Sequence, residues 1–566
     1  MAAFALLPSS LYDAVHDQKL KAVFEEKGFR RPDVHVMGNF SLLWYPSIGG
    51  SSAQVWNDQQ GNVIAVTGTC YFRGKLLSRD IPALFESIRS SHMRDEEFQG
   101  TFCLLVYQAA TDRILCLHDA AAIFRFYTDT RTGAISSSFL ALARIADHLN
   151  LNQDVLGFNL VFGFNPGVHT WINGIERVLH GRQLPEKMDY RRLEVAETIS
   201  EFRNKQEALQ ASADLLVTKM KVAINHDRRS FLGLSSGYDS RLMAALLSHT
   251  TVHDLSFFTF HKPGASDPVI AQKIAQSMGI ELIKKATGRP NDYDAQQEVF
   301  RKAFNFFDGQ AVTMMQYSKP DYTAPFRMDV MGADAVHFSG VGGELFRNYN
   351  YDHGFSSGIR QWMNTYLLAG ADISYFIPGD QAAAVNTLFT NYIQSELECS
   401  STIRLADRKK FYGDLFLRDW HSVRNSAENQ FCHYYTPFSD REVIAMSYAT
   451  RPYQGRGGNF EADLIRILSP TLAKISSGYG YAFDAYPGKA KVLDALRCMV
   501  KMPALASWNK PAETGAASRL TEFEKEQLTV FSTLGLSVQT NNLLNSSKRF
   551  EPVLSAAYSL KHLFNL

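Results

Sequence analysis

Short apolar runs separated by turn residues occupy the chain from about residue 30 to 140. The runs at 61–71 (GNVIAVTGTCY), 100–107 (GTFCLLVY) and 113–118 (RILCLH) are rich in β-branched and aromatic residues. Runs of this length between turn residues are typical of strands in antiparallel or sandwich-like layers. A helical pattern at 81–90 interrupts them, so this region predicts a β layer with a few helices.

From about residue 205 to 350, short apolar runs alternate with segments of helical period. Strands are predicted at 231–234, 254–260 and 281–285, and helices at 240–247 and 268–278. This alternation is typical of βαβ units and a parallel sheet. Residues 355–500 are mostly helical in pattern, and 502–518, rich in Pro, Ala, Gly and Ser, predict a linker or loop. Thr521 with Glu524 predicts a capping box that starts a last helix.

Composition narrows the class of protein. The chain has 566 residues, enough for about three or four compact units or two large ones. Hydrophobic residues make up 45% and charged residues 20%, which excludes disorder as the main state. Lys plus Arg number 58 against 57 Asp plus Glu, without the basic excess of a nucleic-acid-binding protein. Because no apolar run reaches the ~18–20 residues of a membrane span, and the N-terminus lacks a basic signal-peptide region, we expect a cytoplasmic protein without nucleic-acid or membrane partners.

Six cysteines are too few for a disulfide scaffold in so long a chain. No two of them form a CxxC pair, which argues against a structural zinc site. We expect at least four to be buried as small hydrophobic side chains.

A first chemical motif lies at 231–241 (FLGLSSGYDSR), where an apolar strand runs through small residues into a helix. Small residues let the backbone approach a phosphate, and the free N–H groups of a helix N-terminus favour an anion. Ser235, Ser236 and Ser240 add hydroxyl donors. Asp239 would repel a phosphate unless a cation lay between them, which implies Mg²⁺. The alternative is an ordinary strand–turn–helix junction capped by Ser and Asp.

A second motif lies at 336–349 (VHFSGVGGELFRNY), about 100 residues later. A β-like run ends in Ser339-Gly340, and Gly342-Gly343 leads into Glu344. Glycine at this density permits tight backbone geometry and close approach of a ligand.

Residues 234–240 (LSSGYDS) resemble the pyrophosphate loop, L-S-G-G-x-D-S, of the N-type ATP pyrophosphatases, or PP-loop proteins. Asparagine synthetases, β-lactam synthetases and lasso-peptide cyclases carry this loop. The second motif resembles their S-G-x-G-G-D-E-L-F loop, whose Asp joins the first loop's Asp around Mg²⁺. Two alignments of this loop are possible. In the first, which the glycine spacing favours because it needs no gap, Glu344 takes the position of that Asp. In the second, the Asp is deleted and Glu344 matches the next acid of the family loop, which does not bind the metal.

Further segments are similar to the same family, in order, over roughly residues 60–485. Residues 255–260, with Phe258, resemble the family strand on the adenine side of the nucleotide, and 266–268 resemble the start of the helix after it. The other similar segments are 98–127, 171–184, 435–452 and 460–483. The resemblance implies an α/β fold in two parts. Residues 1–195 would form an αββα Ntn-hydrolase-like, glutaminase-like domain, and 196–566 a PP-loop ATP pyrophosphatase (adenine nucleotide α-hydrolase-like) domain with helical additions.

The sequence also departs from the family. Glutamine-hydrolysing members expose Cys as the mature first residue, whereas Met1 is followed here by Ala2-Ala3, so we expect a glutaminase fold without glutaminase activity. Where the family has a lysine near the nucleotide phosphates, this chain has Ala462. Lys474, Arg466 or Arg456 could supply the positive charge of that lysine instead. The family's E-x-R reads His433-x-Tyr435, two side chains that could act as acid or base or simply pack in the core.

The implied reaction is ATP-dependent amide-bond formation through an acyl-adenylate, with release of AMP and pyrophosphate. It would belong to peptide or natural-product biosynthesis, such as lasso-peptide or β-lactam-type cyclisation or amidation. The partners would be ATP, Mg²⁺, a carboxylate-bearing small molecule or peptide, and an amine or ammonia, with a homodimer or a pathway protein as further possibilities. The implied site residues are catalytic Asp239, Glu344, His433 and Lys474; nucleotide-binding Leu234, Ser235, Ser236, Gly237, Asp239, Ser240, Phe258, Ser339 and Gly340; and Mg²⁺-binding Asp239 and Glu344.

Two other readings stay open. A non-catalytic scaffold or partner protein on this fold agrees with Ala462 and the altered second loop, and is opposed by the intact first loop. Sulfur or amine transfer to nucleic acid fits the loop type, but the sequence lacks the basic surface and the cysteines that such chemistry needs.

Two further residues each have two interpretations. Asp308 could contact substrate or form an Asp-Gly turn, and Arg347 could bind a carboxylate or pyrophosphate or lie at the surface. Tyr349 and Tyr351 are expected to pack.

Overall fold

The computed structural model describes residues 2–48, 55–77, 80–90, 92–181, 184–195, 201–224, 227–252, 254–261, 264–286, 290, 292–310, 330–332, 335–348, 356–368, 370–485, 487–500, 520–536, 538–545 and 550–566. The predicted linker at 502–518 and the tyrosines at 349 and 351 lie outside these residues. Within them, no helix has the length and apolar character that crossing a bilayer requires.

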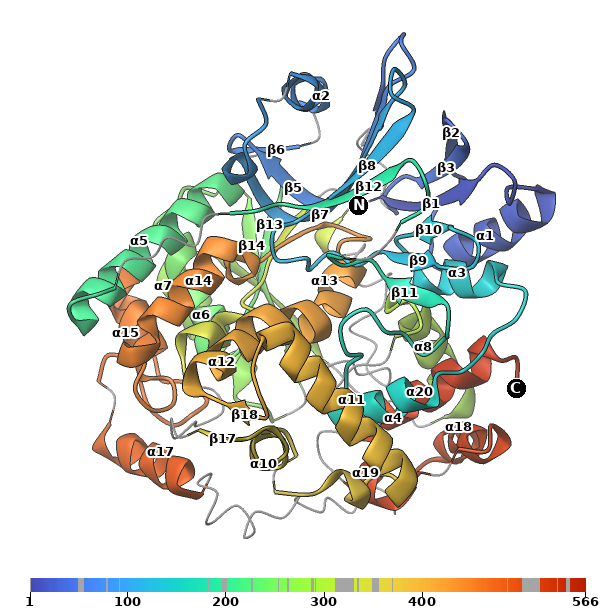
Figure 1. The fold of residues 1–566 in the computed structure, drawn as a ribbon. Helices are drawn as coiled ribbons and strands as arrows, with labels where there is room; N and C mark the ends of the chain where they lie inside the picture. Colours follow the sequence, from blue (N-terminus) through green and yellow to red (C-terminus); the bar gives the residue numbers. More distant parts are fainter. Residues whose placement is uncertain are drawn as a thin grey trace.

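The first part of the chain contains two six-stranded sheets (Figure 1). The first sheet is antiparallel throughout. Its order is β11 (Ile175–Arg177), β9 (Tyr127–Asp129), β10 (Ile135–Ser136), β1 (Ala3–Pro8), β3 (Phe40–Tyr45), β2 (Asp33–Met37). The second has the order β12 (Met188–Arg192), β8 (Arg113–His118), β7 (Phe98–Gln108), β5 (Val63–Phe72), β4 (Val55–Asn57), with β6 (Lys75–Leu76) on β5. Its strands are antiparallel except for the parallel pair β12 and β8.

Alternation of side chains along β1 explains why the two sheets stack. Phe4 and Leu6 point into a core shared with β5, β7 and β8 of the second sheet. Ala5 and Leu7 point the other way, against α1 (Ala14–Glu26) and α3 (Phe139–Ile145). The outer face of the second sheet is covered by α2 (Ile81–Arg89). This part therefore stacks helix, sheet, sheet and helix; its relation to Ntn hydrolases stays a prediction.

The second part is built on a five-stranded parallel sheet. Its order is β15 (Glu281–Ala286), β14 (Leu255–His261), β13 (Ser230–Gly233), β16 (Val336–Phe338), β19 (His433–Tyr435). One face packs on α5 (Lys205–Ala223), α6 (Tyr238–Leu247), α7 (Asp267–Met278) and α15 (Asn459–Leu468). The chain runs from β13 outward to β15 and then returns to β16 on the other side, so the strand order reverses between β13 and β16. Open α/β sheets bind ligands outside the carboxyl ends of the strands at such a switch point.

Helices make up most of the remaining described structure. They are α4 (Gln153–Phe162), α8 (Tyr293–Phe306), α10 (Ile359–Trp362), η4 (Met363–Leu367), α11 (Gly379–Leu397), α12 (Leu405–Lys410), η6 (Phe411–His421), α13 (Ser422–Glu428), α14 (Arg441–Thr450), α16 (Pro470–Ala473), α17 (Gly488–Val500), α18 (Glu522–Thr533), α19 (Thr540–Asn545) and α20 (Phe550–Leu563). Short 3₁₀ turns are η1 (Asp95–Glu97), η3 (Gly343–Phe346), η5 (Ile373–Tyr375), η7 (Pro437–Ser439) and η8 (Arg451–Tyr453), and β17 (Ser357–Gly358) pairs with β18 (Thr402–Ile403). The helix α12–η6–α13 is continuous, and its middle 11 residues, η6, are π-helical.

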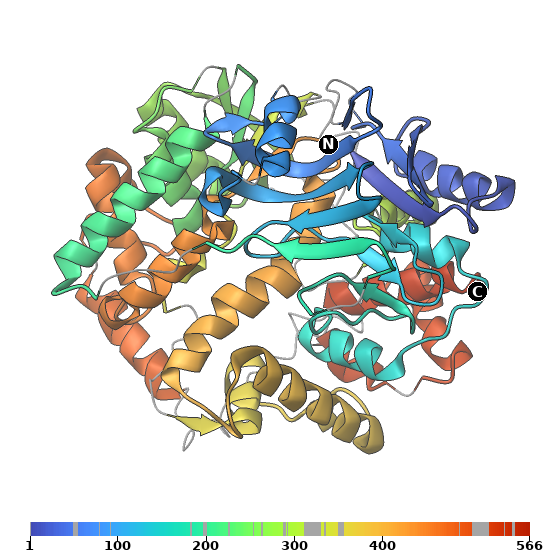
Figure 2. The same ribbon diagram turned by 45° about the horizontal axis from the view of Figure 1, so that its top comes forward.

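The mixed α/β class and the strand–helix alternation predicted between 205 and 350 are confirmed. Thr521 caps α18, and Glu524 reaches back to its backbone N–H, as the capping box predicts. A large core joins the two parts, because α1 and α3 pack in the same cluster as α8, α11 and α20. Figure 2 shows the C-terminal helices beside α4 and below the first sheet. The domain boundary at 195 stays a prediction, since the halves share this core.

Candidate functional site

The loop of the first motif follows β13 directly and opens α6. Leu234 N–H donates to the carbonyl of Phe258 on β14 (2.8 Å), which fixes the start of the loop. The next three amides bind side-chain oxygens: Ser235 N to Ser240 Oγ (3.0 Å), Ser236 N to Asp267 Oδ1 (2.9 Å) and Gly237 N to Ser235 Oγ (3.2 Å). Ser235 is exposed, and Ser236 and Gly237 are half-buried. Three consecutive backbone amides near the surface thus donate to side-chain oxygens, and a bound anion could replace those oxygens as the acceptor.

The loop of the second motif follows β16 and touches the first. A Cβ added at Gly340 would lie 2.7 Å from the carbonyl carbon of Asp239. A Cβ at Gly343 would lie 2.6 Å from Asp239 Oδ1. Gly342 has a φ of +97°, a conformation that other residues rarely adopt. Gly340 and Gly343 therefore let the two loops meet, and Gly342 supplies the backbone conformation that the second loop needs.

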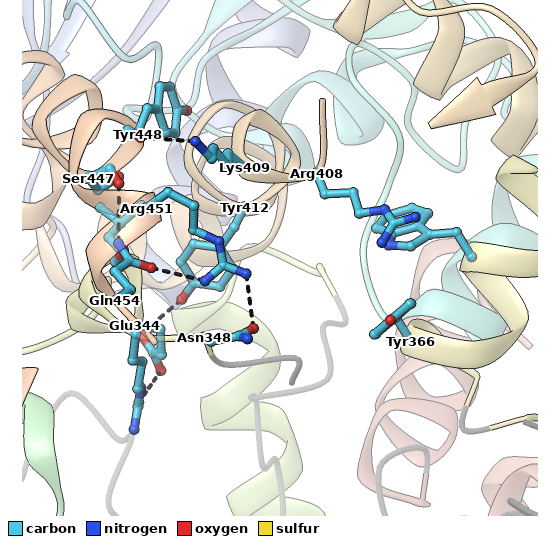
Figure 3. Close-up of a pocket in the computed structure, with 13 residues that line it drawn as sticks. Glu344, Asn348, Tyr366, Arg408, Lys409, Tyr412, Ser447, Tyr448, Arg451 and Gln454 are labelled. Atoms are coloured by element: carbon cyan, nitrogen blue, oxygen red, sulfur yellow. Dashed lines mark hydrogen bonds and ion pairs between the residues drawn. The ribbon is translucent and has the colours of Figure 1, made fainter. Parts of the chain in front are cut away.

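Three carboxylates gather around one guanidinium at this meeting point. Arg347 Nη2 lies 3.0 Å from both oxygens of Asp239 and 3.4 Å from Oε1 of Glu344. Arg347 Nε lies 3.5 Å from Oε2 of Glu461, whose side chain is fully buried on α15. Tyr412 on η6 donates its hydroxyl to Oε2 of Glu344 (2.9 Å; Figure 3). We call Asp239, Glu344, Glu461 and Arg347 the acid cluster.

Burial and the charges of neighbouring side chains compete in setting the pKa values of the acid cluster. Burial raises the pKa of Asp239 to about 6, against the opposing effect of Arg347. Burial, with Asp239 second, raises the pKa of Glu461 well above its ordinary value. For Glu344, burial is outweighed by Arg347 and His421, so its pKa is lowered. The pKa of Arg347 is raised, because its carboxylate neighbours outweigh the effect of burial.

The acid cluster offers carboxylate oxygens to a divalent cation only if Arg347 moves away from Asp239. Three carboxyl groups face one guanidinium, so the cluster carries excess negative charge when its acids are ionised. The carboxylates of Asp239 and Glu344 both contact Nη2 of Arg347, so a metal ion bound by both would take the place of this nitrogen. Carboxylate oxygens are the ligands that Mg²⁺ prefers.

The two alignments of the second loop can be compared with the geometry. The backbone position that faces the Asp239 carboxylate is Gly343, not Glu344. Glu344 instead reaches the cluster from the side, through Arg347 and Tyr412. Its longer side chain brings it to the same guanidinium as Asp239, so its role as a ligand stays a prediction.

Two predicted catalytic residues do not join the acid cluster. His433 is buried at the amino end of β19, paired with Val336, whereas the loops lie at the carboxyl ends of the strands. Lys474 follows α16 and is exposed, and within the described residues its side chain makes no ion pair. Packing thus accounts for His433, and the cation beside Asp239 is Arg347 in place of the suggested lysine.

The remaining predicted binding residues lie at or beside the loops. Ser339 accepts a hydrogen bond from the hydroxyl of Tyr434 (2.7 Å) and binds the amide of Val341. Phe258 is buried, with its ring against Gly233 and His337. Four cysteines, Cys70, Cys103, Cys116 and Cys432, are buried, in agreement with the expectation that at least four would be.

Asp308 does not face the acid cluster. It adopts a φ of 57° before Gly309, the Asp-Gly turn that was one of its two readings. Its carboxylate binds the Lys27 ammonium and the Ser138 hydroxyl, both at 2.5 Å, and the amide of Phe139. Asp308 therefore joins the two parts of the chain.

Sequence reasoning missed Glu461, Tyr412 and the cover over the first loop. Glu461 stands on the apolar stripe of α15 with Leu464, Ile465 and Leu468, and an acid on such a stripe is a signal for a buried charge. Tyr412 carried no such signal, since only tertiary packing brings η6 to the loop.

The cover over the first loop is made by the segment after α16. Gly478 N–H donates to the carbonyl of Ser236 (3.1 Å), and the hydroxyls of Tyr238 and Tyr481 are 2.7 Å apart. The buried Arg241 donates to the carbonyls of Ile475 and Ser476, with its guanidinium over the ring of Phe483. The segment 475–483 is thereby fixed on one side of the loop.

Comparisons with known proteins do not extend this picture. No family model matches the chain, and no curated protein matches it. Among solved structures, a match is the U34-tRNA thiolase NcsA from Methanococcus maripaludis with its 4Fe-4S cluster. It is 12% identical, covers 52% of this chain and 80% of that chain, and has a TM-score of 0.18. Similarity at this TM-score carries no argument, so the resemblance to the asparagine synthetase family stays a prediction.

Proposed function

We propose that this chain forms an amide bond at the expense of ATP, through an acyl-adenylate, and that Mg·ATP binds across the two loops between β13 and β16. The substrate carboxylate would attack the α-phosphorus, the bond to the β-phosphate would break, and pyrophosphate would leave. An amine would then attack the acyl carbon, and AMP would leave. The observation that carries this proposal is the contact of the two loops at the switch point, with Asp239 and Glu344 on one cationic nitrogen.

Each part of the site has a role in this reaction. The amides of Ser235, Ser236 and Gly237 would exchange their side-chain partners for phosphate oxygens. Asp239 and Glu344 would hold Mg²⁺, which neutralises the triphosphate charge. Arg347 would exchange Asp239 for the pyrophosphate leaving group and so supply the positive charge that Ala462 cannot.

The test is ATP-dependent pyrophosphate release by the full chain. A panel of carboxylates is offered with hydroxylamine, an amine that captures an acyl-adenylate. Asp239→Asn removes one charge and keeps the side-chain shape, so it should abolish pyrophosphate release while the circular dichroism spectrum stays unchanged. Asp214→Asn, at an exposed position of α5, is the matched control. Turnover in Asp239→Asn equal to wild type would mean that Asp239 only starts a helix.

The first part of the chain bears on the source of the amine. Ala2 and Ala3 are buried at the start of the first sheet, and neither methyl side chain is a nucleophile. Burial raises the pKa of the Cys70 and Cys103 thiols well above the ordinary value, so they are poor nucleophiles as well. These side chains support our proposal that the reaction uses free ammonia or a bound amine.

A second candidate is a non-catalytic partner protein built on the same fold. Arg347 occupies both oxygens of Asp239, and Ala462 stands buried where the family resemblance expects a lysine. An arginine that never leaves Asp239 would exclude the metal. Failure of the wild-type chain to bind Mg·ATP would favour this candidate.

A further inference from the structure

A pocket of about 60 Å³ lies next to the acid cluster, between α12 with η6, α14 with η8, and α10 with η4 (Figure 3). Its described charged lining residues are the bases Arg347, Arg408, Lys409 and Arg451 and the acid Glu344. Trp362, Tyr366, Tyr412 and Tyr448 supply aromatic walls. A cavity of this size holds a few water molecules or one oxyanion. We call it the cationic pocket.

Arg451 is held in a fixed position in this pocket. Its guanidinium donates to Gln454 Oε1 and to Asn348 Oδ1, both at 3.0 Å. Gln454 is 1% exposed and is itself fixed, because its amide donates to the carbonyls of Leu345 and Ser447. Figure 3 shows Arg451, Gln454 and Asn348 together on one side of the pocket. A guanidinium fixed in this way is prepared for a planar oxyanion.

Lys409 adds a second positive charge close to the first. Lys409 is half-buried, and its ammonium donates to the carbonyl of Tyr448 at 3.3 Å. Burial and the nearby charge of Arg451 both lower the pKa of Lys409. Holding two like charges together at a partly desolvated position costs free energy that a bound anion would recover.

Arg408 marks the opposite side of the pocket. It is 6% exposed, lies with its guanidinium 5.7 Å from the ring centroid of Tyr366, and donates to Ser357 Oγ at 2.9 Å. Figure 3 shows Arg408 and Tyr366 apart from the group around Arg451. Lys409 and Arg451 therefore lie on one side of the pocket and Arg408 on the other.

The cationic pocket is continuous with the acid cluster. Glu344 and Arg347 line both, and Asn348, the next residue, accepts the hydrogen bond from Arg451. A substrate whose carboxylate is placed at the ATP α-phosphate would extend past Glu344 toward Lys409 and Arg451.

We infer that Lys409 and Arg451 bind a second oxyanion of the acyl substrate, a carboxylate or a phosphate remote from the carboxylate that is activated. The inference rests on the proposed function for the orientation of the substrate. It assigns the substrate to the class of acids with at least two anionic groups, and it excludes simple fatty or aromatic monocarboxylates.

The experiment is a calorimetric titration of the full chain with succinate, glutarate and inorganic phosphate, and with butyrate as the monoanionic comparison. Lys409→Met and Arg451→Gln remove the two charges. Lys410→Met and Arg360→Gln remove charges at exposed positions of α12 and α10 and serve as matched controls. Mg·ATP affinity is measured in all variants, which shows whether the adjacent loops remain folded.

We expect at least one dianion to bind, butyrate to bind at least about tenfold more weakly, and both test variants to lose at least about tenfold in dianion affinity while the controls keep it. If the two test variants lose affinity for phosphate alone, the second group of the substrate is a phosphate. If they lose affinity for the dicarboxylates alone, it is a carboxylate. Equal binding of dianion and monoanion, or wild-type dianion binding in both test variants, would overturn the inference. Dianion binding with no Mg·ATP binding in the wild type would instead contradict the proposed function and leave the anion site standing.

Discussion

At the scale of single residues, Glu344 is the decisive position of the second loop. Its carboxylate reaches Arg347 and Tyr412, whereas Gly343 is the position that faces Asp239. The sequence predicted Asp239 and the loop glycines, because small residues after a strand carry a local signal. It left open whether Arg347 binds a carboxylate or lies at the surface. It did not place Glu461 beside Arg347, since that residue arrives from α15, more than a hundred residues later.

If Glu344 holds Mg²⁺, removing its charge should matter more than shortening its side chain. We expect Glu344→Gln to weaken Mg·ATP binding by about ten- to a hundredfold, and Glu344→Asp to retain part of the affinity. Titration of ATP at limiting Mg²⁺ measures both variants. Equal affinity in Glu344→Gln and wild type would exclude Glu344 as a ligand and leave it a partner of Tyr412 and Arg347.

At the scale of elements, the carboxyl edge of the parallel sheet is what places the site. The order β14-β13-β16 brings two loops about 100 residues apart in sequence onto neighbouring strands. Hydrophobic alternation was sufficient to predict β13 to β15 and their helices, because each burial pattern is local. The β-like run before Ser339 also predicted β16. The pattern was not sufficient for β19, which is only three residues long and is fixed by its neighbours.

The close approach of these loops gives a steric prediction. Gly340→Ala would place a methyl group 2.7 Å from the Asp239 carbonyl carbon, so the loops must separate. We expect a loss of about 1–3 kcal/mol in stability and a loss of Mg·ATP binding. The control is Gly379→Ala in the first turn of α11, where a Cβ would have no atom within 4 Å. Thermal unfolding and ATP titration measure both variants; unchanged ATP binding in Gly340→Ala would show that the loops need not touch.

At the scale of the whole molecule, a buried ionic centre fastens the two parts together. Asp419 on η6 binds Arg177 from β11, its neighbour Arg418, and the hydroxyl of Tyr392. It also accepts the amide of Gly167, so both parts of the chain converge on one carboxylate. Such a centre has no sequence signature, since its members are spread over about 250 residues, and this is why the shared core was not predicted.

Removal of that charge should destabilise the whole chain. We expect Asp419→Asn to cost about 3–5 kcal/mol, because it leaves buried cations without their partner. Despite burial, Arg418 and Arg177 lower the pKa of Asp419 to about 2, below the ~4 of an unfolded Asp. Its stabilisation is therefore fully present above pH ~4 and is lost as the pH falls through about 2. Thermal midpoints across this range should differ between variant and wild type at neutral pH and converge in acid; identical midpoints at pH 7 would contradict the assignment.

The most direct test of the central claim is equilibrium binding of ATP to the full chain, measured with and without Mg²⁺ in wild type and Asp239→Asn. The account predicts binding that depends on Mg²⁺ and is at least about tenfold weaker in the variant, a difference of about 1.4 kcal/mol or more. If the wild-type chain does not bind ATP, or if Asp239→Asn binds it equally well, the two loops are not a Mg·ATP site.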